Sequence, residues 1–248
     1  FQANTNVNNE LLSLQSPAVM LDVVKRLHLN IDYLTDGTFY KQVLYGQTLP
    51  MSISFFGLQD NETASLTLRQ GTSGKLELSG FTRNGEEVEG QIEGKLNDTI
   101  ASPIGKLMVE PTPYYNIGFH EPVYITRSTL HGATDAYSSR LSVALSDEKA
   151  TVINLSFQDV CIQRAEDVLN TVIAVYNENW VKDKNQIAVS TSMFINERLG
   201  VIEGELGNVD ENISSYKSEH LLPDVQAASN LYMAQSSETN AQILALNT

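Results

Sequence analysis

The sequence predicts an α+β protein: a mixed α/β base with a β-rich insertion, followed by a long projecting, coiled-coil-like helix at the C-terminal end. Three observations predict this fold class. Apolar and polar residues alternate over about residues 50–109, apolar residues at helical spacing flank that region, and a heptad pattern fills the last third. We therefore expect two domains, residues 1–180 as the base and residues 181–248 as the helical projection, in a chain long enough to bury a sizeable core.

The composition excludes several classes of protein. The chain has 16 Lys and Arg against 30 Asp and Glu, a formal net charge of -14, and no clustered basic surface that could neutralise nucleic-acid phosphates. A single cysteine cannot build a disulfide framework or a zinc ribbon. Without a run of about 18 apolar residues, nothing in this sequence reads as a membrane span.

The N-terminal region predicts a polar leader and then a helix. Residues 1–9 are rich in Asn, which favours a frayed segment. Ser16 suits the N-cap position and Pro17 the first helical position. The apolar face of this helix, which ends near His28, consists of Met20, Val23, Val24 and Leu27.

The β-rich insertion is expected over about residues 36–113. Pairs of apolar residues separated by one polar residue mark short strands there, namely Ile53 and Phe55, Leu66 and Leu68, and Leu76 and Leu78. Glycines punctuate these runs, so we expect an antiparallel meander with one solvated face. Asn84-Gly85 is the best signal for a hairpin turn.

Three further elements follow the insertion. Residues 126–140 form a weak helix candidate, and alternation over residues 141–157 predicts a hairpin. Asp159 is expected to cap the next helix, which runs to about residue 178. Its predicted apolar face consists of Cys161, Ala165, Val168, Val172 and Tyr176, with Cys161 as a buried, inert thiol.

The last third carries the most regular pattern. Seven apolar residues are spaced alternately by four and three positions and predict a coiled-coil seam, namely Ile195, Leu199, Ile202, Leu206, Val209, Ile213 and Tyr216. The helix that carries them is expected to begin near Asp183 and to be interrupted near Pro223. Asp224 can cap a second helix, which looks truncated at the C-terminus of the chain.

A search for chemistry assigns no catalytic, cofactor-binding or metal-ligating residue and no cofactor. The Gly90–Lys95 segment is one residue too short for a phosphate-binding loop and lacks its Ser or Thr. The four histidines have no tight ligand spacing, and His120-Glu121 with His131 is a weak candidate. One stretch contains four carboxylates that we expect to face solvent, namely Glu86, Glu87, Glu89 and Glu93. A glycosidase-type catalytic pair among them is a minor alternative.

Two segments carry a specific resemblance. Residues 164–185 read RAEDVLNTVIAVYNENWVKDKN, with Ala165, Asn170 and the Tyr176-Asn177 pair, and lead into FINERLGVIEGELGNVDENISSYKSEHLLPD. Together with LLSLQSPAVMLDVVKRLHLNIDY near the N-terminus, they resemble the periplasmic region of bacterial polysaccharide co-polymerases, the chain-length determinant family. The resemblance is closest to members fused to a cytoplasmic tyrosine autokinase in the capsule and exopolysaccharide export of Bacteroides-like bacteria.

The resemblance implies a non-catalytic scaffold at the periplasmic face of the bacterial inner membrane, anchored by membrane helices that this sequence lacks. Such a scaffold regulates the chain length of a surface polysaccharide. It forms a homo-oligomer and contacts the polysaccharide polymerase, export proteins and the nascent glycan, and its parent protein can carry a tyrosine kinase. The matching residues are expected to be structural: Ala165 permits close packing, and Asn170 or Tyr176 satisfies backbone groups.

A second class of protein also combines β domains with helices at heptad spacing. Periplasmic adaptors of efflux and secretion systems carry a coiled-coil hairpin between lipoyl-like and barrel segments. This alternative requires such segments on both sides of the hairpin.

Overall fold

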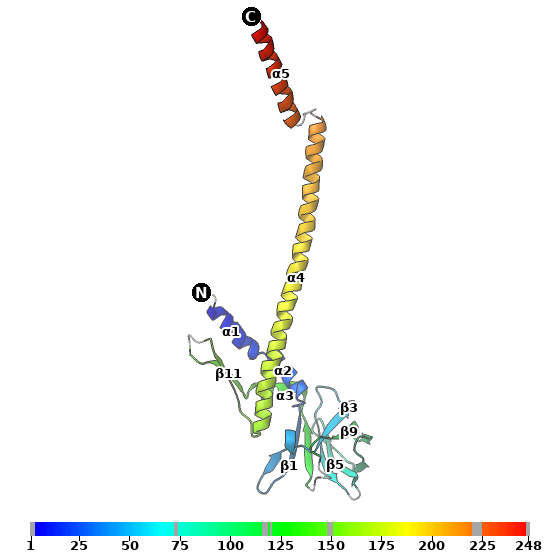
Figure 1. The fold of residues 1–248 in the computed structure, drawn as a ribbon. Coiled ribbons are helices and arrows are strands. Elements are labelled where there is room, and N and C mark those ends of the chain that lie inside the picture. Colours follow the sequence, from blue (N-terminus) through cyan, green and yellow to red (C-terminus); the bar gives the residue numbers. More distant parts are fainter. Residues whose placement is uncertain are drawn as a thin grey trace. The chain divides into compact units, whose positions relative to one another are not determined.

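The computed structural model describes residues 3–71, 74–115, 119, 121–147, 151–219 and 225–246 (Figure 1). It is an α+β protein with a long helix near its C-terminal end, which confirms the predicted fold class. The chain divides into two compact units, Phe1–Val181 and Lys182–Thr248.

The helices of the structure are α1 (Ala3–Leu14), α2 (Pro17–Arg26), the short 3-10 helix η1 (Gly46–Thr48), α3 (Leu130–Ser138), α4 (Ile162–Glu219) and α5 (Val225–Leu246). The strands are β1 (Ile31–Asp36), β2 (Lys41–Val43), β3 (Met51–Phe56), β4 (Ala64–Gln70), β5 (Leu76–Arg83), β6 (Glu86–Val88), β7 (Ile92–Gly94), β8 (Thr99–Ser102), β9 (Gly105–Pro111), β10 (Val123–Arg127), β11 (Leu141–Leu145) and β12 (Ile153–Phe157).

Ten of these strands form two antiparallel sheets rather than the predicted meander. The larger sheet has the order β2-β1-β10-β4-β5-β6, with β7 also paired to β5, and the smaller has the order β3-β9-β8. The inner faces of both sheets share one hydrophobic core, which includes Met51, Ile53, Leu66, Leu78, Phe81, Leu107, Val109 and Ile125. The prediction was wrong about pairing because alternation shows which face of a strand is buried but not which strand lies beside it.

The turn predicted at Asn84-Gly85 is confirmed. The two residues join β5 to β6, and Arg83 lies opposite Glu86 in the register. Asn84 has a φ of 52° and Gly85 a φ of 85°. Positive φ at both central residues matches the twist of the flanking strands, which is why Asn-Gly is favoured there.

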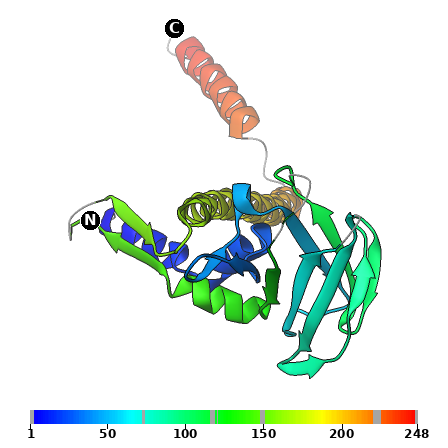
Figure 2. The same ribbon diagram turned by 90° about the horizontal axis from the view of Figure 1, so that it is seen from below.

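A second hydrophobic core lies among helices α1–α3, the β11–β12 hairpin and the first part of α4 (Figure 2). The predicted helix at Pro17 is confirmed, and its N-cap Ser16 accepts a hydrogen bond from the Ala18 N–H. Residues 1–9 were expected to be frayed, but α1 begins at Ala3. Its C-terminal turns pack Leu11 and Leu14 against the second core, and tertiary packing thereby stabilises a helix of weak propensity.

The predicted helix over residues 126–140 is shorter in the structure, because its first residues belong to β10. The side chain of Thr129 caps α3 by accepting a hydrogen bond from the Gly132 N–H at 3.0 Å. The apolar face of α3, made up of Leu130, Ala133 and Tyr137, is buried in the second core.

One continuous helix replaces the two that were expected to begin near Asp159 and Asp183. The 58 residues of α4 run across the division between the units, with residues 162–181 in the first and residues 182–219 in the second. Residues 178–194 contain no Gly or Pro, so nothing in the chain interrupts the backbone hydrogen bonds of the helix there. The interruption expected at Pro223 and the cap expected at Asp224 lie outside the described residues.

The two parts of α4 differ in what their valines contribute to stability. Val172 is 0% exposed in the second core, whereas Val201 is 46% exposed. We expect Val172→Ala to destabilise the protein by about 2 kcal/mol, because two buried methyl groups are lost and a small cavity remains. Val201→Ala is the matched control, and thermal denaturation that shows equal losses for both variants would contradict this assignment.

Candidate functional site

A buried ion pair fixes the start of α4. The side chain of Asp159 is 0% exposed. Its Oδ1 accepts hydrogen bonds from the Cys161 N–H and from Arg164 Nη2, each at 2.8 Å, and its Oδ2 accepts one from Arg164 Nε at 2.9 Å. Asp159 therefore stabilises the first turn of α4, as expected of a capping residue, although the helix itself begins at Ile162. Cys161 precedes the helix and is partly exposed, so the expectation of a buried thiol on the helix face was wrong.

The same arginine joins α4 to the β-sandwich. Arg164 Nη1 donates a hydrogen bond to Asp32 Oδ1 of β1 at 3.0 Å, and its guanidinium lies 5.9 Å from the ring centre of Tyr137 on α3. Burial alone would lower the pKa of Arg164, but its hydrogen bonds to Asp159 and the nearby carboxylates raise it. Arg164 is therefore a permanent cation that holds three elements together.

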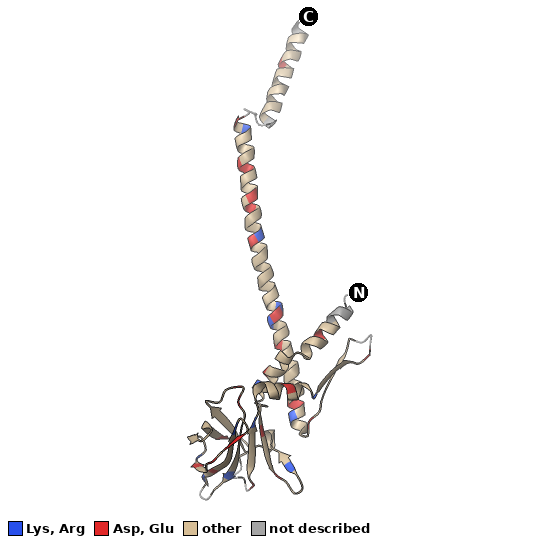
Figure 3. Cartoon of the chain, turned by 180° about the vertical axis from the view of Figure 1, so that it is seen from behind, with Lys and Arg blue, Asp and Glu red and all other residues tan. Residues whose placement is uncertain are grey.

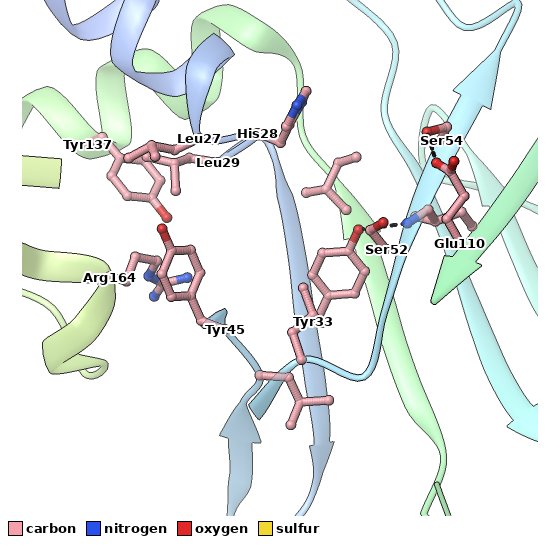
Figure 4. A pocket seen from close by; sticks show the side chains of 14 residues that line it. Leu27, His28, Leu29, Tyr33, Tyr45, Ser52, Ser54, Glu110, Tyr137 and Arg164 are labelled. Carbon is pink, nitrogen blue, oxygen red and sulfur yellow. Dashed lines mark hydrogen bonds between the residues drawn. The ribbon is translucent and has the colours of Figure 1, made fainter. Parts of the chain in front are cut away.

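A pocket of about 280 Å³ opens beside this arginine, between the two hydrophobic cores of the first unit (Figure 4). Much of its wall is aliphatic, with Leu27 and Leu29 from the segment after α2 and Ile31 from β1. Polar groups line the rest, including His28, Ser52, Ser54 and Glu110. Such a mixture of apolar wall and few polar groups is typical of sites for small ligands.

Three tyrosine side chains lie around the pocket. Tyr33 Oη accepts a hydrogen bond from the Ile53 N–H, and Tyr45 Oη donates one to Asp167 Oδ2, each at 3.0 Å. Figure 4 shows the hydroxyls of Tyr45 and Tyr137 pointing toward each other. Tyr45 and Tyr137 can therefore hydrogen-bond to each other, and all three phenols carry a hydroxyl that can hydrogen-bond to a bound molecule.

The tyrosines are protonated at neutral pH. Burial raises the pKa of Tyr33 and that of Tyr137 to about 12 each. The pKa of Tyr45 is raised by burial and by its hydrogen bond to Asp167. At neutral pH they are hydrogen-bonding groups rather than phenolate nucleophiles.

The residues singled out for chemistry are scattered. Glu86, Glu87, Glu89 and Glu93 are exposed, and Glu93 pairs with Lys75 at 2.6 Å. His131 is exposed, and His120 lies outside the described residues. Within the described ranges, no group of three or more His, Cys, Asp or Glu side chains could hold a metal ion.

The four family-matching residues occupy different positions on α4. Ala165 is partly buried, whereas Asn170 and Asn177 are exposed. Tyr176 donates a hydrogen bond to the carboxylate of Glu10 on α1, so its partner is a side chain and not the backbone group that was expected. The structure does not bring these residues together into one site.

The predicted seam forms an apolar stripe on the second unit. Each of its seven residues is between 47% and 59% exposed, namely Ile195, Leu199, Ile202, Leu206, Val209, Ile213 and Tyr216. Acidic and basic side chains are spaced along the same stretch of α4 (Figure 3). We call these seven residues the α4 stripe.

Arg164 was not predicted as a site residue, although the sequence carries a signal for it. Arg164 precedes Val168, Val172 and Val175 at spacings of four, four and three residues, and all four are buried. A charged residue on the buried face of a helix needs a buried partner, so this spacing could have indicated the ion pair. Tyr33 and Tyr45 carried no comparable local signal.

Comparison with known proteins adds no relative to these observations. Neither a protein-family model nor a curated protein matches this sequence significantly. Among the described helices, none is both long enough and apolar enough to cross a lipid bilayer.

Loss of Arg164 should destabilise the first unit strongly. We expect Arg164→Ala to cost about 3–5 kcal/mol, because it removes the two short hydrogen bonds to the buried carboxylate of Asp159 and leaves only the longer contact with Arg140 at 3.4 Å. Chemical denaturation monitored by circular dichroism measures this loss. Arg26→Ala, which removes an exposed ion pair with Glu178, is the control and should have a far smaller effect. Equal stability of Arg164→Ala and the unaltered protein would contradict the proposed role of the pair.

The buried tyrosines should make the protein sensitive to alkali. The folded-state pKa of Tyr33 is raised from 10.0 to about 12, so its stabilising effect is complete below pH 10 and is lost as the pH rises toward 12. Tyr33→Phe should reduce this alkaline loss. It should also lower stability at pH 7 by about 1–3 kcal/mol, because the Ile53 N–H loses its acceptor.

Melting temperatures between pH 8 and 11.5 test the role of Tyr33. Tyr40→Phe is the matched control, since Tyr40 is 74% exposed. It should melt like the unaltered protein at every pH. An unchanged pH dependence in Tyr33→Phe would contradict the assignment.

Proposed function

We propose that this chain is the periplasmic scaffold domain of a polysaccharide co-polymerase, which regulates the chain length and export of a surface polysaccharide. The observation that carries the proposal is the α4 stripe, seven heptad-spaced apolar residues about half exposed on a helix of 58 residues. The resemblance of residues 164–185 and of the heptad segment to the chain-length determinant family supplies the biological role.

The α4 stripe favours association with another helix. Apolar side chains left half exposed in water gain free energy when a neighbouring helix covers them, and heptad spacing presents them along one seam. Gly200, Gly204 and Gly207 lie in the same stretch, each with open space where a Cβ would be. Each costs about 1 kcal/mol relative to Ala in a helix, a cost that close approach of a partner backbone can offset.

The N-terminal part of α4 packs within the first unit. Residues 162–181 of α4 contribute Val168, Val172 and Val175 to the second core, and Arg164 ties the first turn to β1. This packing stabilises the N-terminal part of the helix that carries the α4 stripe, which supports a structural role for α4.

The proposal includes the partners and location that the resemblance implies. The full-length protein forms a homo-oligomer at the periplasmic face of the inner membrane and contacts the polymerase, export proteins and the nascent glycan. A cytoplasmic tyrosine autokinase domain in the parent protein is part of the same proposal. In this role the segment itself carries no catalysis.

The exposed residues of α5 argue against the adaptor alternative. A coiled-coil hairpin needs matching apolar stripes on both arms. Leu231, Tyr232 and Met233 are consecutive and all exposed, so they point in different directions around the helix. At heptad spacing from Leu231, the next positions are Gln235 and Glu238. α5 therefore does not continue a stripe that could pair with α4.

Altering the α4 stripe in the full-length protein tests the proposal. We expect Leu206→Asp to shift the length distribution of the surface polysaccharide in the producing bacterium, because a charge in the seam opposes helix association. Gel electrophoresis of the extracted polysaccharide measures the distribution. Asn208→Asp is the matched control, since it adds the same charge two residues along, on the opposite side of α4.

Deleting the gene should abolish control of the chain length. A deletion strain that exports polysaccharide with an unaltered length distribution would contradict the proposed function. An effect of Asn208→Asp equal to that of Leu206→Asp would contradict the role of the α4 stripe.

A further inference from the structure

The β11–β12 hairpin is a sheet of only two strands, so each strand has an outer edge. Leu141 lies opposite Phe157, Val143 opposite Leu155, and Leu145 opposite Ile153. Two-stranded sheets are marginally stable alone, and an uncovered edge presents backbone groups that can pair with another strand.

The register shows which backbone groups point outward. Ser146 N–H donates to the Val152 carbonyl at 3.0 Å, and Gln158 N–H donates to the Arg140 carbonyl at 3.3 Å. Ser146 with Val152 and Arg140 with Gln158 are therefore hydrogen-bonded pairs at the two ends of the β11–β12 ladder. Hydrogen-bonded and non-hydrogen-bonded pairs alternate in an antiparallel ladder, so the odd-numbered residues of both strands direct their N–H and C=O groups away from the hairpin.

A bond to β11 agrees with this assignment. Gln15 Nε2, which follows α1, donates to the Val143 carbonyl at 3.2 Å. That carbonyl can accept from outside the hairpin only if it points away from β12. The outer edge of β11 is therefore partly used by the chain itself.

The outer edge of β12 lacks such a contact among the described residues. Ile153, Leu155 and Phe157 direct their backbone groups outward there, and no hydrogen bond joins these groups to any other part of the chain that the structure describes. Their side chains are only partly buried against the second core. An added strand can therefore supply hydrogen-bond partners for these backbone groups and bury more of the apolar side chains.

The composition of β12 does not protect this edge. Neither β11 nor β12 contains a charged residue or a proline, the usual devices that prevent pairing at exposed edges. Asn154 and Ser156 on the other face are exposed, small and uncharged. Nothing along the strand would repel a second strand.

We propose that β12 pairs in antiparallel fashion with β12 of a second copy of this chain, about a two-fold axis at Leu155. The strand is self-complementary in this arrangement. Leu155 lies opposite its own counterpart, Ile153 lies opposite Phe157, and Asn154 lies opposite Ser156. Every apolar side chain of β12 then lies opposite an apolar one, and every outward N–H or C=O group lies opposite a group that can hydrogen-bond to it. The two hairpins form one four-stranded sheet.

This pairing is independent of the role in polysaccharide synthesis and of the α4 stripe. It uses residues of the first unit only and depends on backbone hydrogen bonds, whereas the α4 stripe lies on the second unit and associates through side chains. Its test is therefore made on purified protein, without reference to the glycan.

Two double variants at the same positions test the pairing. Asn154→Lys with Ser156→Lys places like charges opposite each other across the two-fold axis, and Asn154→Lys with Ser156→Glu places opposite charges there. Both changes lie on the exposed face, where the neighbours across the hairpin are Ala144 and Ser142. Circular dichroism and thermal melting show whether each variant keeps the fold.

Sedimentation velocity over a concentration series measures the association of the full 248-residue chain. All variants are compared in a Leu206→Asp background, which removes association through the α4 stripe. We expect the background protein to form dimers, the lysine–lysine variant to dimerise at least tenfold more weakly, and the lysine–glutamate variant to dimerise at least as well as the background.

Two outcomes would overturn the proposal. The first is a background protein that stays monomeric up to 200 µM, a result that would leave the edge to a different partner. The second is equal dimerisation of the two double variants. Neither result bears on the polysaccharide length distribution, so the two proposals fail separately.

Discussion

The pair formed by Asp159 and Arg164 is the contact on which the rest of this structure depends. A fully buried carboxylate is costly unless hydrogen bonds and an opposite charge compensate it. Arg164 supplies two hydrogen bonds and the nearer positive charge, the Cys161 N–H supplies a third bond, and Arg140 contacts the same carboxylate at 3.4 Å. Because the arginine also binds Asp32, one buried cation determines where α4 begins and how it meets the sandwich.

The first unit has two hydrophobic cores, and Arg164 joins the elements that carry them. The sheets bury their inner faces against each other, and the helices bury theirs against the β11–β12 hairpin and α4. The tyrosine-lined pocket lies where the two cores meet beside Arg164. Each tyrosine has an apolar ring and a polar hydroxyl, so it suits a boundary between packed side chains and polar contacts.

Two surfaces of the chain remain suited to association, and they differ in their physics. The α4 stripe offers side chains at heptad spacing and gains from the burial of apolar area. The edge of β12 offers backbone donors and acceptors whose pairing fixes register and direction. A protein that carries both can form distinct contacts through its two units.

Short-range features of the fold could be predicted from the sequence because neighbouring residues determine them. The Asn84-Gly85 turn, the capped start of α2, the alternation in β11 and β12 and the heptad spacing in α4 all depend on residues a few positions apart. Only the tertiary structure decided that β4 pairs with β10, that α1 is ordered and that Arg164 reaches Asp32. These contacts join residues far apart in the sequence, where local patterns show which groups must be buried but not which partners bury them.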